Sequence, residues 1–145
     1  MSGKLCRMMP KYIGTKVVQA KPMTMTEAQN VLGREIKPAT VEEDGYLVKY
    51  KDGYKSWSPK SVFDKTYKPY EDFKDRLCIE YDELCDRLTK LRAALNKDGF
   101  LDKVGDVQYD LMKKQLYGMN NYHNALKSRM IDMGIFDDTD CCSGC

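Results

Sequence analysis

Residues 76–91 read Arg76-Leu77-Cys78-Ile79-Glu80-Tyr81-Asp82-Glu83-Leu84-Cys85-Asp86-Arg87-Leu88-Thr89-Lys90-Leu91. In and just beyond this stretch, apolar side chains recur at alternating intervals of four and three residues, at Leu77, Tyr81, Leu84, Leu88, Leu91 and Leu95. This spacing places all six side chains along one side of an α-helix. The sequence therefore predicts a long helix from about residue 71 to residue 95, ended by Asn96-Lys97-Asp98-Gly99.

A second seam with the same spacing lies further along the chain. Its members are Met112, Leu116, Met119, His123, Leu126, Met130 and Met133. They predict a second helix from about residue 106 to residue 133, with Gly134 as its stop. Because the connection between the two helices is short, we expect them to fold back on each other as an antiparallel pair.

The residues before the helices alternate with the period of a β-strand. Residues 46–50 and 54–57 are rich in aromatic side chains, and Asp52-Gly53 between them is a strong hairpin signal. Residues 12–20 are rich in β-branched side chains and predict a third strand.

Two short helices are expected beside these strands. Thr24 and Glu27 fit a capping box for a helix over residues 26–32. Ser58 and Pro59 fit the N-cap and the first residue of a helix that runs through Phe63.

These elements predict an α+β fold, with a small N-terminal antiparallel β-module followed by a C-terminal antiparallel pair of long helices. The expected domains are a β-rich module over residues 1–67, an oligomerising helical hairpin over residues 68–135, and a disordered Cys-rich tail over residues 136–145.

Charge and composition exclude several classes of partner. Residues 1–70 carry 13 Lys and Arg against 7 Asp and Glu, a net of +6, whereas residues 71–145 carry 11 against 15, a net of −4. There is no run of basic residues, so binding to DNA or RNA is not indicated. No apolar run approaches the roughly 20 residues of a membrane span, and no signal peptide is recognisable. We expect a cytosolic protein that has no membrane partner.

The residues offer little for catalysis. His123 is the only histidine, and there is no Gly-rich phosphate loop, G-x-S-x-G or H-E-x-x-H motif. Cys141, Cys142 and Cys145 supply three thiols, whereas structural zinc normally takes four ligands. The sequence therefore predicts a binding protein that is not an enzyme and has no cofactor or metal. A nucleotide hydrolase is the rival that metal-dependent turnover would reveal.

The polar side of the first long helix carries the candidate binding site. Arg87 and Lys90 are three residues apart and can reach one anion, while Tyr70 and Phe73 lie upstream with Arg76 close by. Aromatic rings with paired cations suit a nucleotide, since a ring stacks on the base and cations meet phosphate. The same charges also fit a coiled-coil flank that contacts another helix.

His123 has two interpretations as well. It falls on the apolar seam of the second helix, which is typical of a hydrogen-bonded histidine at a packed interface. It can contribute to a site only together with other groups.

The stretch from Arg76 to Leu91 resembles the first long helix of the anti-CBASS cyclic-nucleotide sponge family of phages. The second helix is similar too, through Leu111, Gln115, Leu116, Met119, Tyr122, Leu126 and Arg129. The resemblance covers about residues 69–133. Residues 11–16 and 45–59 look like a small module found at the start of assorted phage proteins, which the compact members of the sponge family lack.

The resemblance implies a function. The family sequesters cyclic di- and trinucleotides made by host antiviral enzymes without cleaving them, as a hexamer with pockets between chains. An aromatic residue near the start of the first long helix stacks on a base, and a cation further along meets phosphate. The matching residues are Tyr70, Phe73, Arg76, Arg87 and Lys90, with Tyr122 and His123 added from the second helix.

We therefore expect a phage anti-defence protein that captures a cyclic nucleotide in the host cytoplasm. The alternative is a protein-interaction adaptor that docks a partner through its helical seam and binds no small ligand.

Overall fold

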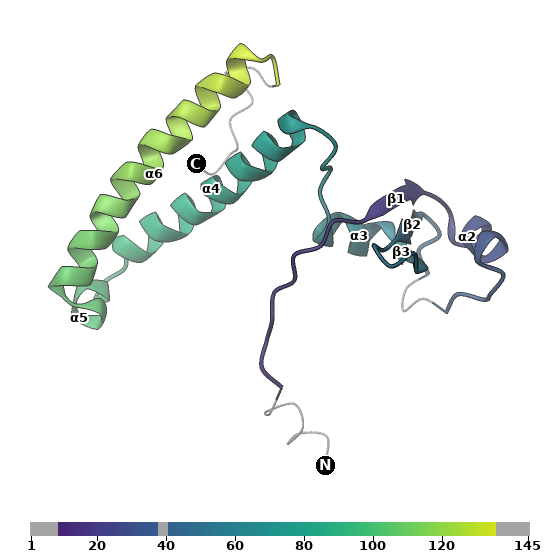
Figure 1. Cartoon of the computed structure of the whole chain (residues 1–145). Helices are drawn as coiled ribbons and strands as arrows, with labels where there is room; N and C mark the ends of the chain where they lie inside the picture. The colour runs from purple at the N-terminus through teal and green to yellow at the C-terminus, as the bar shows by residue number, and fades with distance from the viewer. Residues whose placement is uncertain (1–8, 38–40, 136–145) are drawn as a thin grey trace. The chain divides into compact units, whose positions relative to one another are not determined.

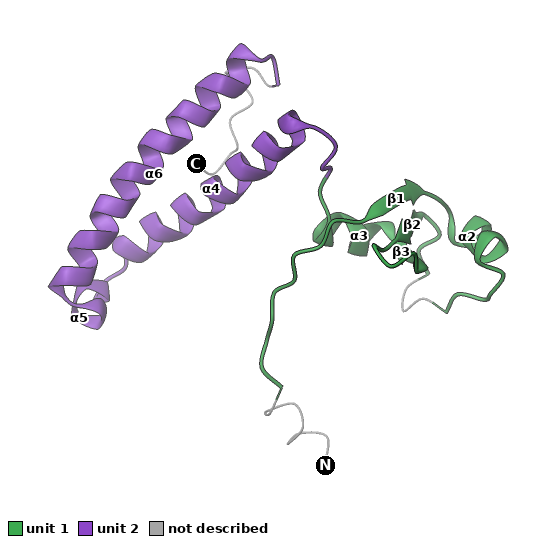
Figure 2. Cartoon of the chain, in the orientation of Figure 1, with its two compact units in different colours: residues 1–68 green, residues 69–145 purple. Residues whose placement is uncertain are grey.

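The computed structural model describes residues 9–37 and 41–135. The chain divides into two compact units between Lys68 and Pro69 (Figure 2). Unit 1 holds a three-stranded sheet with short helices, and unit 2 holds two long helices with a short one between them (Figure 1). The fold is therefore α+β, with the sheet before the long helices. The tail expected to be disordered, residues 136–145, lies outside the described residues.

The sheet is antiparallel and follows the order of the sequence. Its strands are β1 (Gln19–Pro22), β2 (Gly45–Lys49) and β3 (Lys55–Pro59), with β2 in the centre. The chain turns between β2 and β3 at Asp52 and Gly53, where Gly53 has a φ of 89° and the Tyr54 amide donates to Asp52 Oδ1 at 3.0 Å. The hairpin predicted from Asp-Gly is confirmed.

The strand predicted over residues 12–20 is largely wrong, because β1 begins only at Gln19. Gln19 pairs with Lys49, the last residue of β2. Beyond that pair the chain turns into the hairpin loop, so residues upstream of Gln19 have no partner strand inside the sheet. Residues 12–18 have β-prone side chains, but a strand forms only where a neighbouring strand can pair with it.

The helices of unit 1 begin in two different ways. In α2 (Met25–Leu32) the predicted capping box is present, with the Glu27 amide donating to Thr24 Oγ1 at 3.2 Å. In α3 (Lys60–Thr66) the predicted Ser58 cap is wrong, since Pro59 ends β3 and is the N-cap. The Ser61 amide donates instead to Glu42 at 3.0 Å, so a carboxylate far away in sequence caps this helix.

Glu43 makes the folding stability of unit 1 depend on pH. Its carboxylate accepts the Thr26 hydroxyl at 2.6 Å and the Thr26 amide at 2.9 Å, and these bonds hold the pKa of Glu43 below its ordinary value. A lowered folded-state pKa contributes stability at neutral pH, and that contribution is lost as pH falls through the acidic range. We expect Glu43→Gln to unfold more readily than the wild type at neutral pH, with a smaller difference at about pH 3.

The measurement is urea unfolding followed by the fluorescence of Trp57, the single tryptophan, which lies in β3 of unit 1. A difference in unfolding free energy between the two proteins that is the same at both pH values would contradict this assignment of Glu43.

Unit 2 is a helical hairpin made of α4 (Phe73–Leu95), α5 (Phe100–Val104) and α6 (Asp106–Asp132). The bounds of α4 and α6 agree closely with the predicted helices. Asp72 caps α4 by accepting from the Asp75 amide at 2.9 Å. The short helix α5 was not predicted. It occupies the expected loop, and Gly99 and Gly105 flank it with φ values of 75° and 83°.

The two long helices pack antiparallel through the predicted seam (Figure 1). The Tyr109 hydroxyl near the start of α6 donates to the Leu95 carbonyl at the end of α4, at 3.2 Å. All six seam residues of α4 are buried, and Leu88 is fully so. Of the α6 seam, only Leu126 and Met130 are buried. A helix pair covers each helix from one side only, so residues at the margin of the seam keep contact with solvent.

None of the helices in the described ranges has the length and apolar character that crossing a membrane requires.

Candidate functional site

An aromatic and cationic cluster lies at the start of α4. The Arg76 guanidinium lies 5.8 Å from the centre of the Tyr70 ring. Tyr70 and Phe73 are exposed, although such rings usually lie in a core. Asp72 and Asp75 fix the first turn of α4 and so hold these side chains at the helix start. This cluster can offer a ring to a base and a guanidinium to an anion.

Arg87 and Lys90 form a second group further along α4. Arg87 lies 3.6 Å from Glu83, and Lys90 lies 2.6 Å from Asp86, each pair four residues apart and largely exposed. Solvated pairs of this type contribute only about 0.3–0.5 kcal/mol. An incoming phosphate can therefore displace either carboxylate at little cost.

The two groups share one side of α4 but lie far apart along it. Eleven residues separate Arg76 from Arg87, which is about 16 Å at about 1.5 Å per residue. The same eleven residues make about three full turns, so the two side chains project from the same side of the helix. A single chain thus presents two separate partial sites.

A hydrogen bond between α4 and α6 shows which residues of the two helices lie on the same side of the hairpin. The Arg92 guanidinium of α4 donates to Asn120 Oδ1 of α6, so these two side chains lie on one side of the helix pair. Arg87 and Lys90 are turned about 140° and 160° around α4 from Arg92, and Tyr122 is turned about 160° around α6 from Asn120. Tyr122 therefore lies on the same side of the hairpin as the two cations.

Tyr122, a predicted site residue, belongs to a row on that side of α6 whose periodicity was not predicted. Val107, Leu111 and Tyr122 are exposed apolar residues, and a Cβ added at Gly118 would meet no atom within 4 Å. Spacings of four, seven and four residues relate them, which is a helical repeat. The signal was present in the sequence, but the stronger methionine seam beside it obscured it.

His123 lies in the seam and not on this exposed side. Its ring stacks on Tyr81 with centres 5.0 Å apart, and its Nδ1 lies 3.5 Å from Asn124 Oδ1. Its Nε2 is buried without a hydrogen-bond partner among the described residues. The position matches the interpretation of a hydrogen-bonded histidine at a packed interface, with Nδ1 as the bonded nitrogen.

We expect His123→Phe to stabilise the hairpin by about 1 kcal/mol, because the ring keeps its stack on Tyr81 and the unpaired Nε2 is removed. Urea unfolding followed by the helical signal in circular dichroism measures this change. His123→Ala is the control and should destabilise the hairpin, since it also removes the stacked ring. A destabilised His123→Phe would show that Nε2 has a partner in solution.

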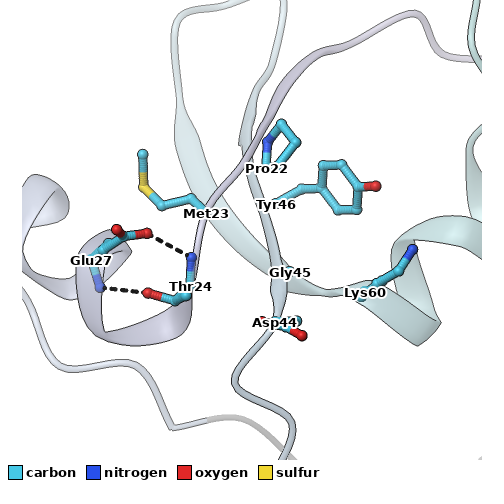
Figure 3. Close-up of a pocket in the computed structure, with 8 residues that line it drawn as sticks. All are labelled: Pro22, Met23, Thr24, Glu27, Asp44, Gly45, Tyr46 and Lys60. Carbon is cyan, nitrogen blue, oxygen red and sulfur yellow. Dashed lines mark hydrogen bonds between the residues drawn. The ribbon is translucent and has the colours of Figure 1, made fainter.

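The described cavities lie away from the predicted residues. One, of about 360 Å³, is in unit 1 and is shown in Figure 3. Its lining consists of Pro22, Met23, Thr24, Glu27, Asp44, Gly45, Tyr46 and Lys60. The capping box of α2 forms one side of it, and Lys60 on the other side is paired with Asp64. A cavity of about 230 Å³ lies around α5.

The thiols and carboxylates of the described ranges do not gather into a metal site. No group of three or more His, Cys, Asp or Glu side chains there could hold an ion. Burial raises the pKa of the Cys78 thiol, and nearby aspartates, Asp82 foremost, raise it further. Cys85 is buried in the seam. Cys141, Cys142 and Cys145 lie outside the described residues.

Comparison with known proteins bears on unit 2. No curated protein and no solved structure matches the chain. Residues 71–132, which span 62 of the 145 residues, match the model of a protein family described as Sequestin. The matched range covers α4, α5 and α6. The helical hairpin, with its exposed cations and aromatic rings, is therefore similar to the Sequestin family and consistent with a family of the sponge type.

Proposed function

We propose that this chain is a phage anti-defence protein that captures cyclic di- or trinucleotide messengers of host immunity in the host cytoplasm without cleaving them. The observation that carries the proposal is the Sequestin match over residues 71–132, the part of the chain that displays most of the candidate site. The family name suggests that a ligand or partner is sequestered.

The exposed aromatic and cationic side chains at the start of α4 and along it support a nucleotide as the ligand. Phe73 and Tyr70 offer aromatic surface for a base, and Arg76, Arg87 and Lys90 offer charge for phosphate. A protein that sequesters a nucleotide without cleaving it must bind that nucleotide tightly. The aromatic rings and the cations must therefore surround the ligand together.

One chain does not bring its two partial sites together. The partial sites are about 16 Å apart along α4. In our proposal the cluster around Phe73 comes from one chain and Arg87 with Lys90 from another, within a homo-oligomer that is a hexamer as in the similar sponge family. The exposed Leu111 and Tyr122 on the same side of the hairpin supply apolar surface for such an assembly.

A protein-interaction adaptor is the second candidate. It is favoured by the exposed Val107, Leu111 and Tyr122 on one side of α6, because exposed apolar surface often marks a protein interface. The buried α4 seam does not offer such a surface, so a partner would dock on α6. An adaptor of this kind would bind its partner protein and no nucleotide.

Titration calorimetry of the full chain against a panel of cyclic di- and trinucleotides and cyclic ADP-ribose isomers tests the proposal. We expect tight binding of at least one, and mass spectrometry of the released ligand should find it unchanged. A linear product would favour a hydrolase, and no binding across the panel would favour the adaptor. Light scattering that shows a monomer at micromolar concentration would contradict the pocket between chains.

A further inference from the structure

We propose that residues 11–21 of unit 1 form a docking strand for an extended acidic segment of a partner protein, separate from the nucleotide site of the hairpin. β1 occupies one edge of the sheet and pairs only with β2. Its outer edge therefore presents backbone N–H and C=O groups that no strand of the sheet satisfies.

The open edge continues beyond the sheet. Residues 9–18 run on from β1 as an extended segment that leaves the sheet (Figure 1). Pro10 and Pro22, which have no amide N–H, bracket the stretch between them. Val17 makes no backbone hydrogen bond to any described residue. The segment thus offers the backbone of a strand without a partner.

The side chains of this segment are those of a buried strand. Ile13 is 97% exposed, Tyr12 89% and Val17 70%. Such residues favour a pleated, half-buried surface, and the described residues of unit 1 do not provide one for them. Successive residues of a strand point to opposite faces, so Ile13 and Val17 share one face and Tyr12 lies on the other. The side chains of an added strand would lie beside Ile13 and Val17 on one face and beside Tyr12 on the other.

Charge selects the partner. Lys11, Lys16 and Lys21 lie in this segment, and residues 9–22 contain no Asp or Glu. A second copy of the chain is a poor occupant. Antiparallel pairing centred on Lys16 would put Lys16 opposite itself and Lys11 opposite Lys21, and like charges directly opposite are destabilising. A strand with acidic residues between apolar ones satisfies the backbone, the apolar side chains and the charge together.

A polyanion such as single-stranded nucleic acid would satisfy only the charge. Sequence-tolerant binding of single strands uses several stacked aromatic side chains along a basic groove. Residues 9–22 carry one aromatic residue, Tyr12. The backbone edge therefore favours a peptide.

Fluorescence anisotropy of the full chain with a labelled peptide of alternating Glu and Val tests the proposal. We expect binding, with slowed amide hydrogen exchange over residues 12–18 in the complex. A peptide in which Lys replaces Glu should not bind. Val17→Pro removes one amide from the docking edge outside the paired sheet, and it should weaken binding about tenfold. Val17→Thr keeps the amide and the branched shape, and it should bind nearly as the wild type does.

Three outcomes would overturn the proposal. They are failure of the Glu and Val peptide to bind, equal binding by Val17→Pro and wild type, and displacement of the peptide by oligothymidylate, which would assign the segment to nucleic acid. Calorimetry with cyclic nucleotides on the same variants should be unchanged, so this test and that of the proposed function can fail independently.

Discussion

Arg87→Ala and Lys90→Ala should each weaken the binding of a cyclic nucleotide by about a hundredfold. Phosphate carries fixed negative charge, and hydrogen bonds to charged groups are stronger than neutral ones. Removing one cation from a partly desolvated pocket costs about 2–3 kcal/mol, and each 1.4 kcal/mol is about tenfold in affinity. Calorimetry on each variant with the ligand that binds the wild type measures this loss.

The structure makes these substitutions clean tests of binding. The side chains of Arg87 and Lys90 are 69% and 74% exposed in the single chain, so their removal should change folding stability by less than about 0.5 kcal/mol. Lys113→Ala is the matched control, because Lys113 is an exposed lysine paired with Asp110 at 2.8 Å. It lies about 20° around α6 from Asn120 and so on the other side of the hairpin. It should bind as the wild type does.

Phe73→Ala and Trp57→Ala complete the comparison. Phe73→Ala should weaken binding through loss of the stacking ring. Trp57→Ala should destabilise unit 1, because the buried indole donates to the Met23 carbonyl at 2.8 Å. It should not abolish nucleotide binding. If the α4 variants remain assembled and bind normally while Trp57→Ala does not, the nucleotide site lies in unit 1 and our assignment is wrong.

Sequence patterns predicted the elements of this fold better than their ends. The α4 seam and the Asp-Gly hairpin succeeded because each is a local signal that tertiary contacts reinforce. β1 and the cap of α3 failed for the opposite reason. The length of β1 is set by where β2 ends, and α3 is capped by Glu42, which lies 19 residues from Ser61. Neither partner can be identified from the local sequence.

The candidate site shows the same division. Spacing alone placed Arg76 and Arg87 on one side of a helix. It could not place Tyr122 on that side of the hairpin, since this depends on how α6 is rotated against α4, which the bond between Arg92 and Asn120 reveals. Nor could spacing show that Glu83 and Asp86 pair with the cations, because several charged neighbours were available to each.

Leu88→Ala should lower the unfolding free energy of the hairpin by about 2–5 kcal/mol, the usual range for a buried leucine replaced by alanine. Leu88 is 0% exposed at the centre of the cluster formed by α4 and α6, so the lost methyl groups leave a cavity among packed neighbours. A whole domain is stable by only about 5–15 kcal/mol, so the loss is a large fraction of the total. Circular dichroism at the helical signal during urea unfolding measures it.

Leu101→Ala is the control, because Leu101 is 42% exposed in α5, and it should change stability by less than about 0.5 kcal/mol. The effect of added ligand on the unfolding midpoint then distinguishes Leu88→Ala from the cation variants. Leu88→Ala keeps every proposed ligand contact, so saturating nucleotide should raise its unfolding midpoint as much as it raises that of the wild type. Arg87→Ala should show the reverse, with normal stability alone and a much smaller rise with ligand. A Leu88→Ala protein as stable as the wild type would mean that the seam between α4 and α6 is not the core of unit 2.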